Sequence, residues 1–495
     1  MGIKASLSKP FAKWVQSQTK KWADKPHETQ EKVFKDLLQK AKNTAFGKDH
    51  NFKNIKNYQD FKQEVPVRDY EALRPYFDRM VKGEEDVLWP GKPLYLSKTS
   101  GTTSGAKYIP LTKESIPHHI DAARNAILHY IADTGKANFV NGKMIFLQGS
   151  PELDESGPIP VGRLSGIVAH HVPGYLQKNR MPSFQVNTIE DWEKKVDAIC
   201  KETLSEKMSL ISGIPPWVQM YFERLLEISG KQSISEIFPD FSLFIYGGVN
   251  YEPYRPIMEK LIGKKVDSIE LYPASEGFIA YQDTQKEKGM LLLLNSGMFY
   301  EFVKAEEFHE ENPKRISLAE VELNQNYVLI LNTNAGLWGY NLGDIVRFVS
   351  TKPYRIVVSG RLKHYTSAFG EHVIAEEVEK AMAIANQKTG ISVSEFHLAP
   401  QVKPKNGLPY HEWFIEAELN KMEKEKLAAA LNDEMVKVNP YYKDLIEGQI
   451  LQALKITLLP KGSFKQFMKS NGKLGGQNKL PRLANDRKIA DQLLV

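Results

Sequence analysis

The chain has 495 residues, which is long enough for two or more domains of ordinary size. Hydrophobic residues make up 42% of it and charged residues 25%, a composition typical of globular proteins that excludes a disordered or fibrous chain. The 66 basic and 60 acidic residues leave a net charge of +6, which suits anionic small molecules but is too diluted to indicate nucleic-acid binding.

The cysteine content and the hydropathy of the chain indicate its cellular compartment. Cys200 is the single cysteine, which excludes an intramolecular disulfide and is typical of a reducing cytosol. No apolar run reaches the ~20 residues that a membrane-spanning helix needs, and no secretory signal is recognisable. These observations predict a cytoplasmic protein.

Residues 1–24 predict a helix on which aromatic side chains, including Phe11, Trp14 and Trp22, alternate with lysines. The first six residues, "MGIKAS", also satisfy the pattern for myristoylation of Gly2. One interpretation is a basic amphipathic helix that contacts a membrane surface. We favour the other, in which the aromatic face packs against the helix's own domain, because six-residue motifs often arise by chance.

Helices and strands then alternate along the chain. A helical pattern at 28–43 is followed by a helix predicted to begin at Thr112 and to end near Gly135. Four short apolar segments, each closed by small or polar residues, predict strands at 143–150, 207–216, 241–250 and 266–277. Such alternation predicts an α/β fold with a mostly parallel sheet, in which ligands bind beyond the carboxyl ends of the strands.

The pattern changes twice more towards the C-terminus. Short strands separated by turns predict a β-rich part from about 289 to 360. Beyond it, two helical patterns and one strand predict a smaller α+β unit, at 375–390, 421–438 and 411–419. We therefore expect a large domain over residues 1–362 and a small, mobile domain over residues 363–495.

The stretch "SKTSGTTSGAKYIP" (97–110) contains small polar residues with little to bury: Ser97, Thr99, Ser100, Gly101, Thr102, Thr103, Ser104 and Gly105. Its glycines allow successive backbone N–H groups to turn inward as an anion-binding nest, and Lys107 adds a positive charge. The spacing does not match a Walker A loop. A phosphate-binding loop is therefore indicated, with an ordinary flexible surface loop as the alternative.

Two further motifs lie at predicted strand ends. Gly247 and Gly248 close the third strand, and "YPASE" closes the fourth with Tyr272, Ser275 and Glu276. A carboxylate beside a hydroxyl can hold Mg²⁺ together with phosphate oxygens and water. The ring of Tyr272 can lie along an adenine, although a turn containing Ser-Glu is also common in proteins without a ligand.

Three charged residues follow later in the chain. Asp344, in "YNLGD", opens a predicted strand, where an acid is unfavourable without partners; it can accept from both hydroxyls of a ribose or cap a turn. Arg361 lies at the predicted domain boundary. Lys479 lies between two glycines and Pro481, and it becomes functional if the small domain brings its charge to a phosphate or carboxylate.

In this order the motifs resemble those of the adenylate-forming superfamily, and more closely those of the GH3 family of acyl acid amido synthetases. "TSGTTSG" is similar to the family's phosphate loop, "YPASE" to its metal and adenine motif, and "YNLGD" to its ribose motif. The terminal Gln-x-Lys-x-Pro-Arg segment is matched by Gln477, Lys479, Pro481 and Arg482. The resemblance extends over nearly the full length of the chain.

The resemblance implies a ligase that joins a carboxylic acid to ATP as an acyl-adenylate and then transfers the acyl group to an amino acid. It implies that the loop from Ser97 to Lys107 holds phosphates and that Glu276 and Ser275 serve the Mg²⁺ site. It also implies that Gly247, Gly248 and Tyr272 frame the adenine and that Asp344 holds the ribose. Arg361, in the hinge-like segment "SGRLK", is a further implied nucleotide-binding residue. Lys479 and Glu276 are the implied catalytic residues.

Two other functions remain open. The same fold serves acid:CoA ligases, and a non-catalytic relative would bind nucleotide without turnover. The resemblance does not identify the acid, because side chains of the acyl pocket do not carry over. Arg124, His170 and His171 lie in segments where such a pocket could form, although ordinary partly buried histidines are the simpler expectation.

Overall fold

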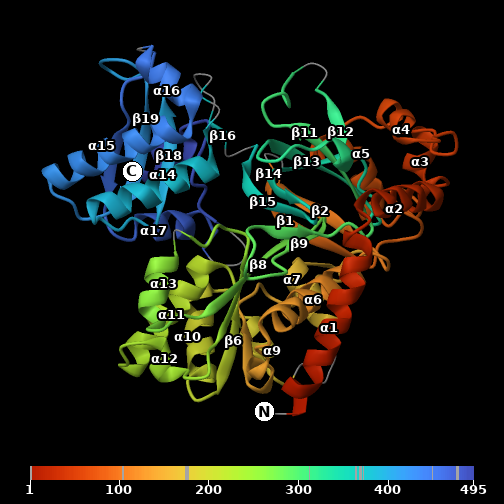
Figure 1. Cartoon of the computed structure of the whole chain (residues 1–495), viewed down its shortest axis with the longest axis horizontal. Coiled ribbons are helices and arrows are strands. Elements are labelled where there is room, and N and C mark those ends of the chain that lie inside the picture. Colours follow the sequence, from red (N-terminus) through yellow and green to blue (C-terminus); the bar gives the residue numbers. More distant parts are fainter. Residues whose placement is uncertain are drawn as a thin grey trace. The chain divides into compact units, whose positions relative to one another are not determined.

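The computed structural model describes residues 3–102, 105–172, 178–252, 254–310, 313–362, 365–366, 371, 373–448, 450–474 and 479–494 (Figure 1). The chain divides into two compact units. Unit 1 consists of Met1–Tyr251, Arg255–Leu342 and Arg347–Val357, and unit 2 of Glu252–Tyr254, Gly343–Val346 and Val358–Val495. Among the described helices, none has both the length and the apolar character that a bilayer crossing requires.

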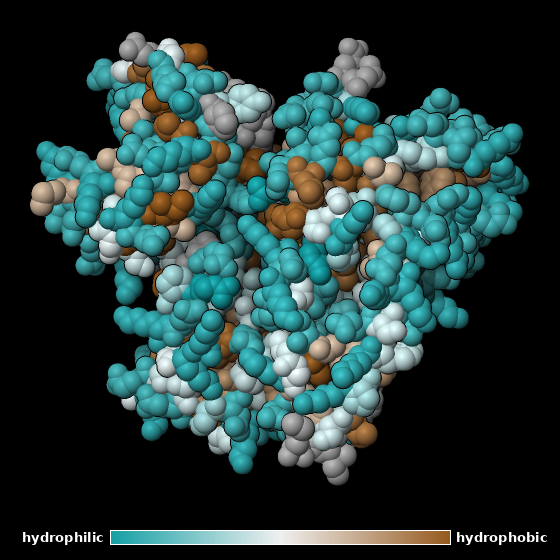
Figure 2. Space-filling model, in the orientation of Figure 1, coloured by the Kyte–Doolittle hydropathy of each residue, from teal (hydrophilic) through white to brown (hydrophobic). Residues whose placement is uncertain are grey.

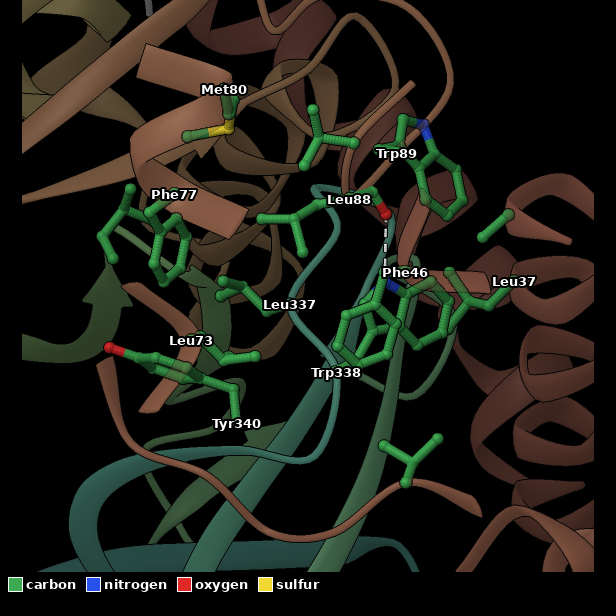
Figure 3. Packing of buried hydrophobic residues seen from close by; sticks show 14 of the residues in the cluster. Leu37, Phe46, Leu73, Phe77, Met80, Leu88, Trp89, Leu337, Trp338 and Tyr340 are labelled. Atoms are coloured by element: carbon green, nitrogen blue, oxygen red, sulfur yellow. Dashed lines mark hydrogen bonds between the residues drawn. The ribbon is translucent and has the colours of Figure 1, made fainter. Parts of the chain in front are cut away.

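Unit 1 contains five N-terminal helices and a sixth after its first two strands: α1 (Ile3–Ala23), α2 (Pro26–Ala41), α3 (Ala45–Asp49), α4 (Tyr58–Glu64), α5 (Tyr70–Val81) and α6 (Ile116–Thr134). The side chains of Asn57 and Asp69 cap α4 and α5 by accepting from N–H groups of the first turn. Helices α2–α5 bury aromatic residues in a cluster that includes Trp338 and Tyr340 (Figure 3). There Trp338 Nε1 donates to the Leu88 carbonyl at 3.0 Å, which fixes the chain just before Tyr340.

Helix α1 packs on unit 1 through its small residues. Ala5, Ala12 and Val15 are buried in a cluster shared with α6. Phe11 and Trp14 stay 43% and 56% exposed, and their rings stack on each other at 5.6 Å. The prediction that the aromatic face packs against the domain is therefore wrong for these two rings, because α1 approaches α6 through side chains small enough for close contact.

Helix α6 begins later than the sequence predicts. The hydroxyls of Thr112 and Ser115 each accept from the other residue's N–H, at 3.1 and 2.9 Å, and Thr112 Oγ1 donates to the Asn334 carbonyl. These bonds form a separate turn, so the helix starts at Ile116. The predicted end is confirmed, since Gly135 closes the last turn with φ +71°.

One twelve-stranded sheet forms the centre of the fold, and its first half is parallel. The predicted strands are confirmed as β3 (Lys143–Phe146), β6 (Met208–Ser212), β7 (Leu243–Gly247) and β8 (Asp267–Ala274), with β5 (Arg180–Met181) at the edge. Strands β3, β6, β7 and β8 follow one another in chain order and pair in parallel, whereas β5 pairs in parallel with the outer side of β3. Since such crossovers are right-handed in nearly all proteins, the helices that connect these neighbours are expected on one face.

The helices cover both faces of this parallel half (Figure 1). The connecting helices contact one another: α10 (Trp192–Thr203), α11 (Pro215–Ser229), α12 (Ile234–Ile237) and α13 (Arg255–Ile262). Helices α1 and α6 lie on the other face, where they share a core with Leu210, Ile245 and Ile269 of the strands. The predicted α/β class is confirmed.

The second half of the sheet confirms the β-rich texture predicted for 289–360. It contains β9 (Gly277–Tyr281), β10 (Met290–Leu292), β11 (Met298–Lys304), β12 (Arg315–Ser317), β13 (Asn326–Thr333), β14 (Tyr340–Thr351) and β15 (Tyr354–Arg361). Strand β9 pairs antiparallel with β8, so the direction of the sheet reverses at the turn that carries Ser275 and Glu276. A separate sheet holds β1 (Tyr95–Thr102), β2 (Gly105–Leu111) and β4 (Val161–Gly162).

Unit 2 is an α+β unit, and its predicted helices and strand are confirmed. Its three-stranded sheet has the order β18 (Phe396–Gln401), β19 (Tyr410–Glu416), β20 (Lys455–Leu459). Helices α14 (Ala375–Thr389) and α15 (Lys421–Val438) pack on it around the buried Trp413. The remaining elements are β16 (Tyr365–Thr366), β17 (Val373–Ile374), α16 (Pro440–Glu447), α17 (Ser463–Ser470) and α18 (Lys488–Leu493).

Candidate active site

The predicted phosphate-binding stretch forms the end of the β1–β2 hairpin. The register pairs Thr102 with Gly105, so the connection consists of Thr103 and Ser104, which lie outside the described residues. The pairing is irregular between Thr99 and Thr102. Most of the stretch expected as a loop is therefore strand. Only the backbone is described for Ser100, Gly101, Thr102, Gly105 and Ala106.

Two serine hydroxyls join this hairpin to the β8–β9 turn. Ser97 Oγ lies 2.8 Å from Ser275 Oγ, and both residues are buried. They are 178 positions apart in the sequence, so only the fold brings them together. The predicted phosphate-binding strand and the predicted metal motif are therefore neighbours in unit 1.

Glu276, next to Ser275, takes part in a polar chain that ends in a positive charge. The buried Tyr340 hydroxyl donates to Glu276 Oε1 at 3.3 Å, and Lys107 Nζ donates to the same hydroxyl at 3.4 Å. Burial raises the pKa of Tyr340, and the negative charge of Glu276 raises it further. The phenol therefore stays protonated and links the cation to the carboxylate.

The geometry of β7 and β8 explains the two glycines at the end of β7. A Cβ on Gly247 would lie 2.5 Å from the Leu271 carbonyl oxygen of β8, so that only glycine allows the two backbones to approach this closely. Gly248 has φ +81°, a left-handed conformation that glycine adopts without strain. Tyr272 is 8% exposed in β8, beside this turn. The glycines thus shape the backbone at the carboxyl ends of the parallel strands.

In unit 2, Asp344 and Arg361 form an ion pair. Arg361 Nε donates to Asp344 Oδ1 at 2.5 Å; the carboxylate is buried, and the arginine is half-exposed. Gly343, just before the aspartate, has φ +86°, and its carbonyl accepts from the Leu362 N–H at 2.8 Å. Asp344 lies within β14 rather than at its start, and the ion pair supplies the partner that an acid in a strand requires.

Lys479 lies within electrostatic range of this pair. Lys479 is exposed at the surface, although many protein atoms surround its ammonium group. The loss of surrounding water and the charge of Arg361 lower the pKa of the Lys479 ammonium to about 8, and Asp344 opposes the shift. Unit 2 thus groups three of the predicted site residues.

The chain after Lys479 is firmly anchored. Residues 482–484 form a short parallel bridge with β18, in which the Leu398 N–H donates to the Arg482 carbonyl at 2.9 Å. The buried Arg482 guanidinium donates to the Tyr254 hydroxyl at 2.9 Å and lies 3.6 Å from Glu395. Tyr254 in turn donates to Glu395 at 2.5 Å. This anchor holds the segment that carries Lys479.

Three family models match the chain in sequence order. They are the GH3 family N-terminal domain at residues 15–185, the GH3 family central domain at 291–361, and the GH3 family C-terminal domain at 376–488. Together they cover more than half of the chain. The chain belongs to the GH3 family.

Named GH3 relatives are similar over much of the chain. Indole-3-acetic acid-amido synthetase GH3.3 of Arabidopsis thaliana is 21% identical over 94% of this chain and 90% of its own length. Jasmonoyl–L-amino acid synthetase JAR4 of Nicotiana attenuata is 22% identical over 64% of this chain and 66% of its own. These relatives are amido synthetases.

Solved structures support the GH3 fold. GH3.15 acyl acid amido synthetase has a TM-score of 0.80 with 17% identity, over 98% of this chain and 96% of that one. A 2-hydroxyisobutyryl-CoA ligase has a TM-score of 0.61 with 12% identity, over 95% and 92% of the two chains. At these identities the likeness shows the fold alone, and it confirms the predicted acyl-adenylate synthetase-like architecture.

The structure also brings two tyrosines that the motifs did not identify to the candidate site and to the Arg482 anchor. Tyr340 is the first residue of "YNLGD", a motif in which the sequence indicates a role only for the aspartate. Tyr254 follows the glycine turn and belongs to no motif. Of the residues considered for an acyl pocket, Arg124 is exposed and paired with Asp121 at 2.9 Å. His170 Nε2 lies 2.7 Å from the Pro151 carbonyl, as an ordinary structural histidine does.

Proposed function

We propose that this GH3 protein is an ATP-dependent ligase that conjugates a carboxylic acid to an amino acid. A carboxylate oxygen of the acid attacks the α-phosphorus of ATP, the bond to pyrophosphate breaks, and an acyl-adenylate forms. The amine nitrogen of the amino acid then attacks the acyl carbon, AMP leaves, and the nitrogen loses a proton to give the amide. Family membership supports this reaction class.

The observation that carries the proposal is the polar cluster of unit 1. Ser97 meets Ser275 at 2.8 Å, and Glu276 is linked through Tyr340 to Lys107. The stretch from Ser97 to Lys107 would bind the triphosphate, and the ammonium of Lys107 would offset its charge. Phosphoryl transfer depends mainly on such positioning and charge neutralisation.

Mg²⁺ fits Glu276. The ion typically takes one or two carboxylates together with phosphate oxygens and waters, and Glu276 is a buried carboxylate that already accepts a hydrogen bond from Tyr340. When bound, Mg²⁺ would neutralise charge on the phosphates. Tyr340, which donates to Oε1 of Glu276, would help to hold this carboxylate in place for the ion.

The remaining nucleotide contacts would come from the glycine turn and from unit 2. Gly247, Gly248 and Tyr272 would frame the adenine. Asp344 would accept from the ribose hydroxyls, with Arg361 holding the carboxylate. Lys479 would stabilise charge during adenylation. We further propose that residues 363–495 are the mobile small domain, which presents different residues to the two half-reactions.

The reaction is tested by measuring carboxylate-dependent exchange of pyrophosphate into ATP across a library of acids, with each hit rescreened against amino acids and CoA. We expect one or more acids to stimulate exchange, and mass spectrometry to identify an amide product. A thioester instead would identify an acid:CoA ligase, and the absence of any acid-dependent exchange would contradict the proposal.

Matched variants complete this test. Glu276→Gln should abolish exchange, whereas Glu287→Gln, at an exposed position of unit 1, should leave it unchanged. Equal loss in both variants would contradict the role of Glu276.

We also propose that the protein is located in the cytoplasm. Its one cysteine, Cys200, is buried, and burial raises the pKa of the thiol to about 12. Such an inert thiol suits a reducing environment.

A further inference from the structure

Helix α1 carries an apolar stripe that its packing leaves in water. Leu7, Phe11 and Trp14 are 67%, 43% and 56% exposed. Their spacing of four and three residues places them on one face of the helix. The buried face is a different one, formed by Ala5, Ala12, Val15 and Thr19. The stripe is therefore not needed to dock α1 on unit 1.

All of the side-chain charge on α1 has one sign. Helix α1 contains five lysines and no acidic residue: Lys4, Lys9, Lys13, Lys20 and Lys21. By helical spacing, Lys4 and Lys21 extend the face of Leu7, Phe11 and Trp14 at its two ends, and both are exposed. The surface over α1 in Figure 2 mixes hydrophilic and hydrophobic residues.

We propose that this face of α1 docks on an anionic lipid bilayer. Long lysine side chains place their charge at the headgroups while their stems lie along apolar surface, and an indole ring is favoured at the same depth. A helix that buries a few apolar side chains at the headgroup boundary, with lysines beside them, binds such surfaces by a combination of burial and charge.

A second copy of the chain fits this face less well. Two copies joined symmetrically would bring the same lysine-rich helix against itself, and neither copy has an acidic residue on α1 to balance the charge. An anionic surface supplies that balance and requires no complementary shape. The proposal is independent of the ligase reaction, because α1 contributes no residue to the proposed site.

The test uses the full chain and sedimentation with vesicles of phosphatidylcholine, with or without phosphatidylglycerol. We expect binding only to the anionic vesicles and a decrease as salt is raised. Replacing two rings, Phe11→Ser with Trp14→Ser, should weaken binding by about tenfold or more, since each ring loses its burial. Phe184→Ser is the matched control, because Phe184 is also 56% exposed, and it should bind as the parent does.

Four outcomes would overturn the proposal. They are an absence of binding to anionic vesicles, equal binding to neutral ones, unchanged binding by the double variant, and a dimer in light scattering that the double variant abolishes. Acid-dependent pyrophosphate exchange should be equal in the parent and the double variant, so that a loss of binding cannot be attributed to misfolding.

Discussion

At the scale of single residues, Lys479 provides a prediction about pH. Its pKa is lowered to about 8, so the ammonium is charged below that pH and neutral above it. If the charge stabilises the adenylation transition state, pyrophosphate exchange should fall as the pH rises through about 8. Lys479→Ala should lower exchange by ~10²-fold or more, consistent with the loss of one preorganised donor.

Lys479→Arg separates charge from other effects, because a guanidinium stays protonated throughout this range. The exchange rate of this variant should be lower at neutral pH because the geometry differs. It should not change as the pH rises through the range in which the rate of the parent falls. A decline that persists unchanged in the arginine variant would assign the titration to another group and remove Lys479 from the charge-stabilising role.

Tyr340 provides the second residue-scale prediction. Tyr340→Phe keeps the ring in the aromatic core but removes the hydroxyl that joins Lys107 to Glu276. A hydrogen bond to a charged group contributes about 1.5–3 kcal/mol, so the apparent Mg²⁺ affinity in the exchange assay should fall by ~10-fold or more. An unchanged Mg²⁺ titration, with normal folding, would show that Glu276 does not need this donor.

Tyr340 also shows what the sequence can and cannot reveal about the site. Motif residues such as Ser275, Glu276 and Asp344 are recognisable because their short motifs follow one another in the order that is typical of the GH3 family. A buried tyrosine beside Trp338 has the same sequence signature as an ordinary core residue. Its role depends on which side chains the fold brings to its hydroxyl, and local sequence does not contain that information.

At the scale of elements, the C-terminal segment that carries Lys479 is held in part by the guanidinium of Arg482. Arg482 donates to Tyr254 and to the Ser394 carbonyl and lies beside Glu395. Arg482→Ala leaves these buried acceptors without their donor and should lower the free energy of unfolding of unit 2 by about 1.5–3 kcal/mol. Chemical denaturation measures this change.

The matched control is Lys488→Ala, which removes an exposed ion pair with Asp486 on the same terminal segment and should leave stability unchanged. Equal destabilisation by both variants would show that the segment is sensitive to any loss of charge. A stable Arg482→Ala variant would show that the bridge to β18 anchors the segment without the guanidinium.

The elements themselves were mostly predictable. Alternating apolar strands and helices identified the parallel series β3, β6, β7 and β8, because periodicity and glycine turns are local signals. Two of the errors have a common cause. The start of α6 depends on Asn334, which accepts from Thr112 across more than two hundred residues, and the orientation of α1 depends on how closely alanines can approach α6. Both are tertiary effects.

At the scale of the whole molecule, the residues proposed to bind the nucleotide form one group in each unit. Unit 1 groups Ser97, Ser275, Glu276 and Lys107, and unit 2 groups Asp344, Arg361 and Lys479. The proposal assigns the phosphate and metal ligands to the first group and the acceptor for the ribose to the second. The ligase proposal therefore requires that one ATP molecule stabilises both units.

Calorimetry with ATP and Mg²⁺ tests this requirement. A ligand that binds only the folded state stabilises it by about 2.7 kcal/mol at a hundred times its dissociation constant, so a nucleotide held by both units should raise the unfolding temperature of both. Glu276→Gln in unit 1 and Asp344→Ala in unit 2 should each reduce the shift of both transitions. If saturating MgATP moved one unit's transition alone, the two groups of residues would not share a nucleotide and the ligase mechanism would be wrong.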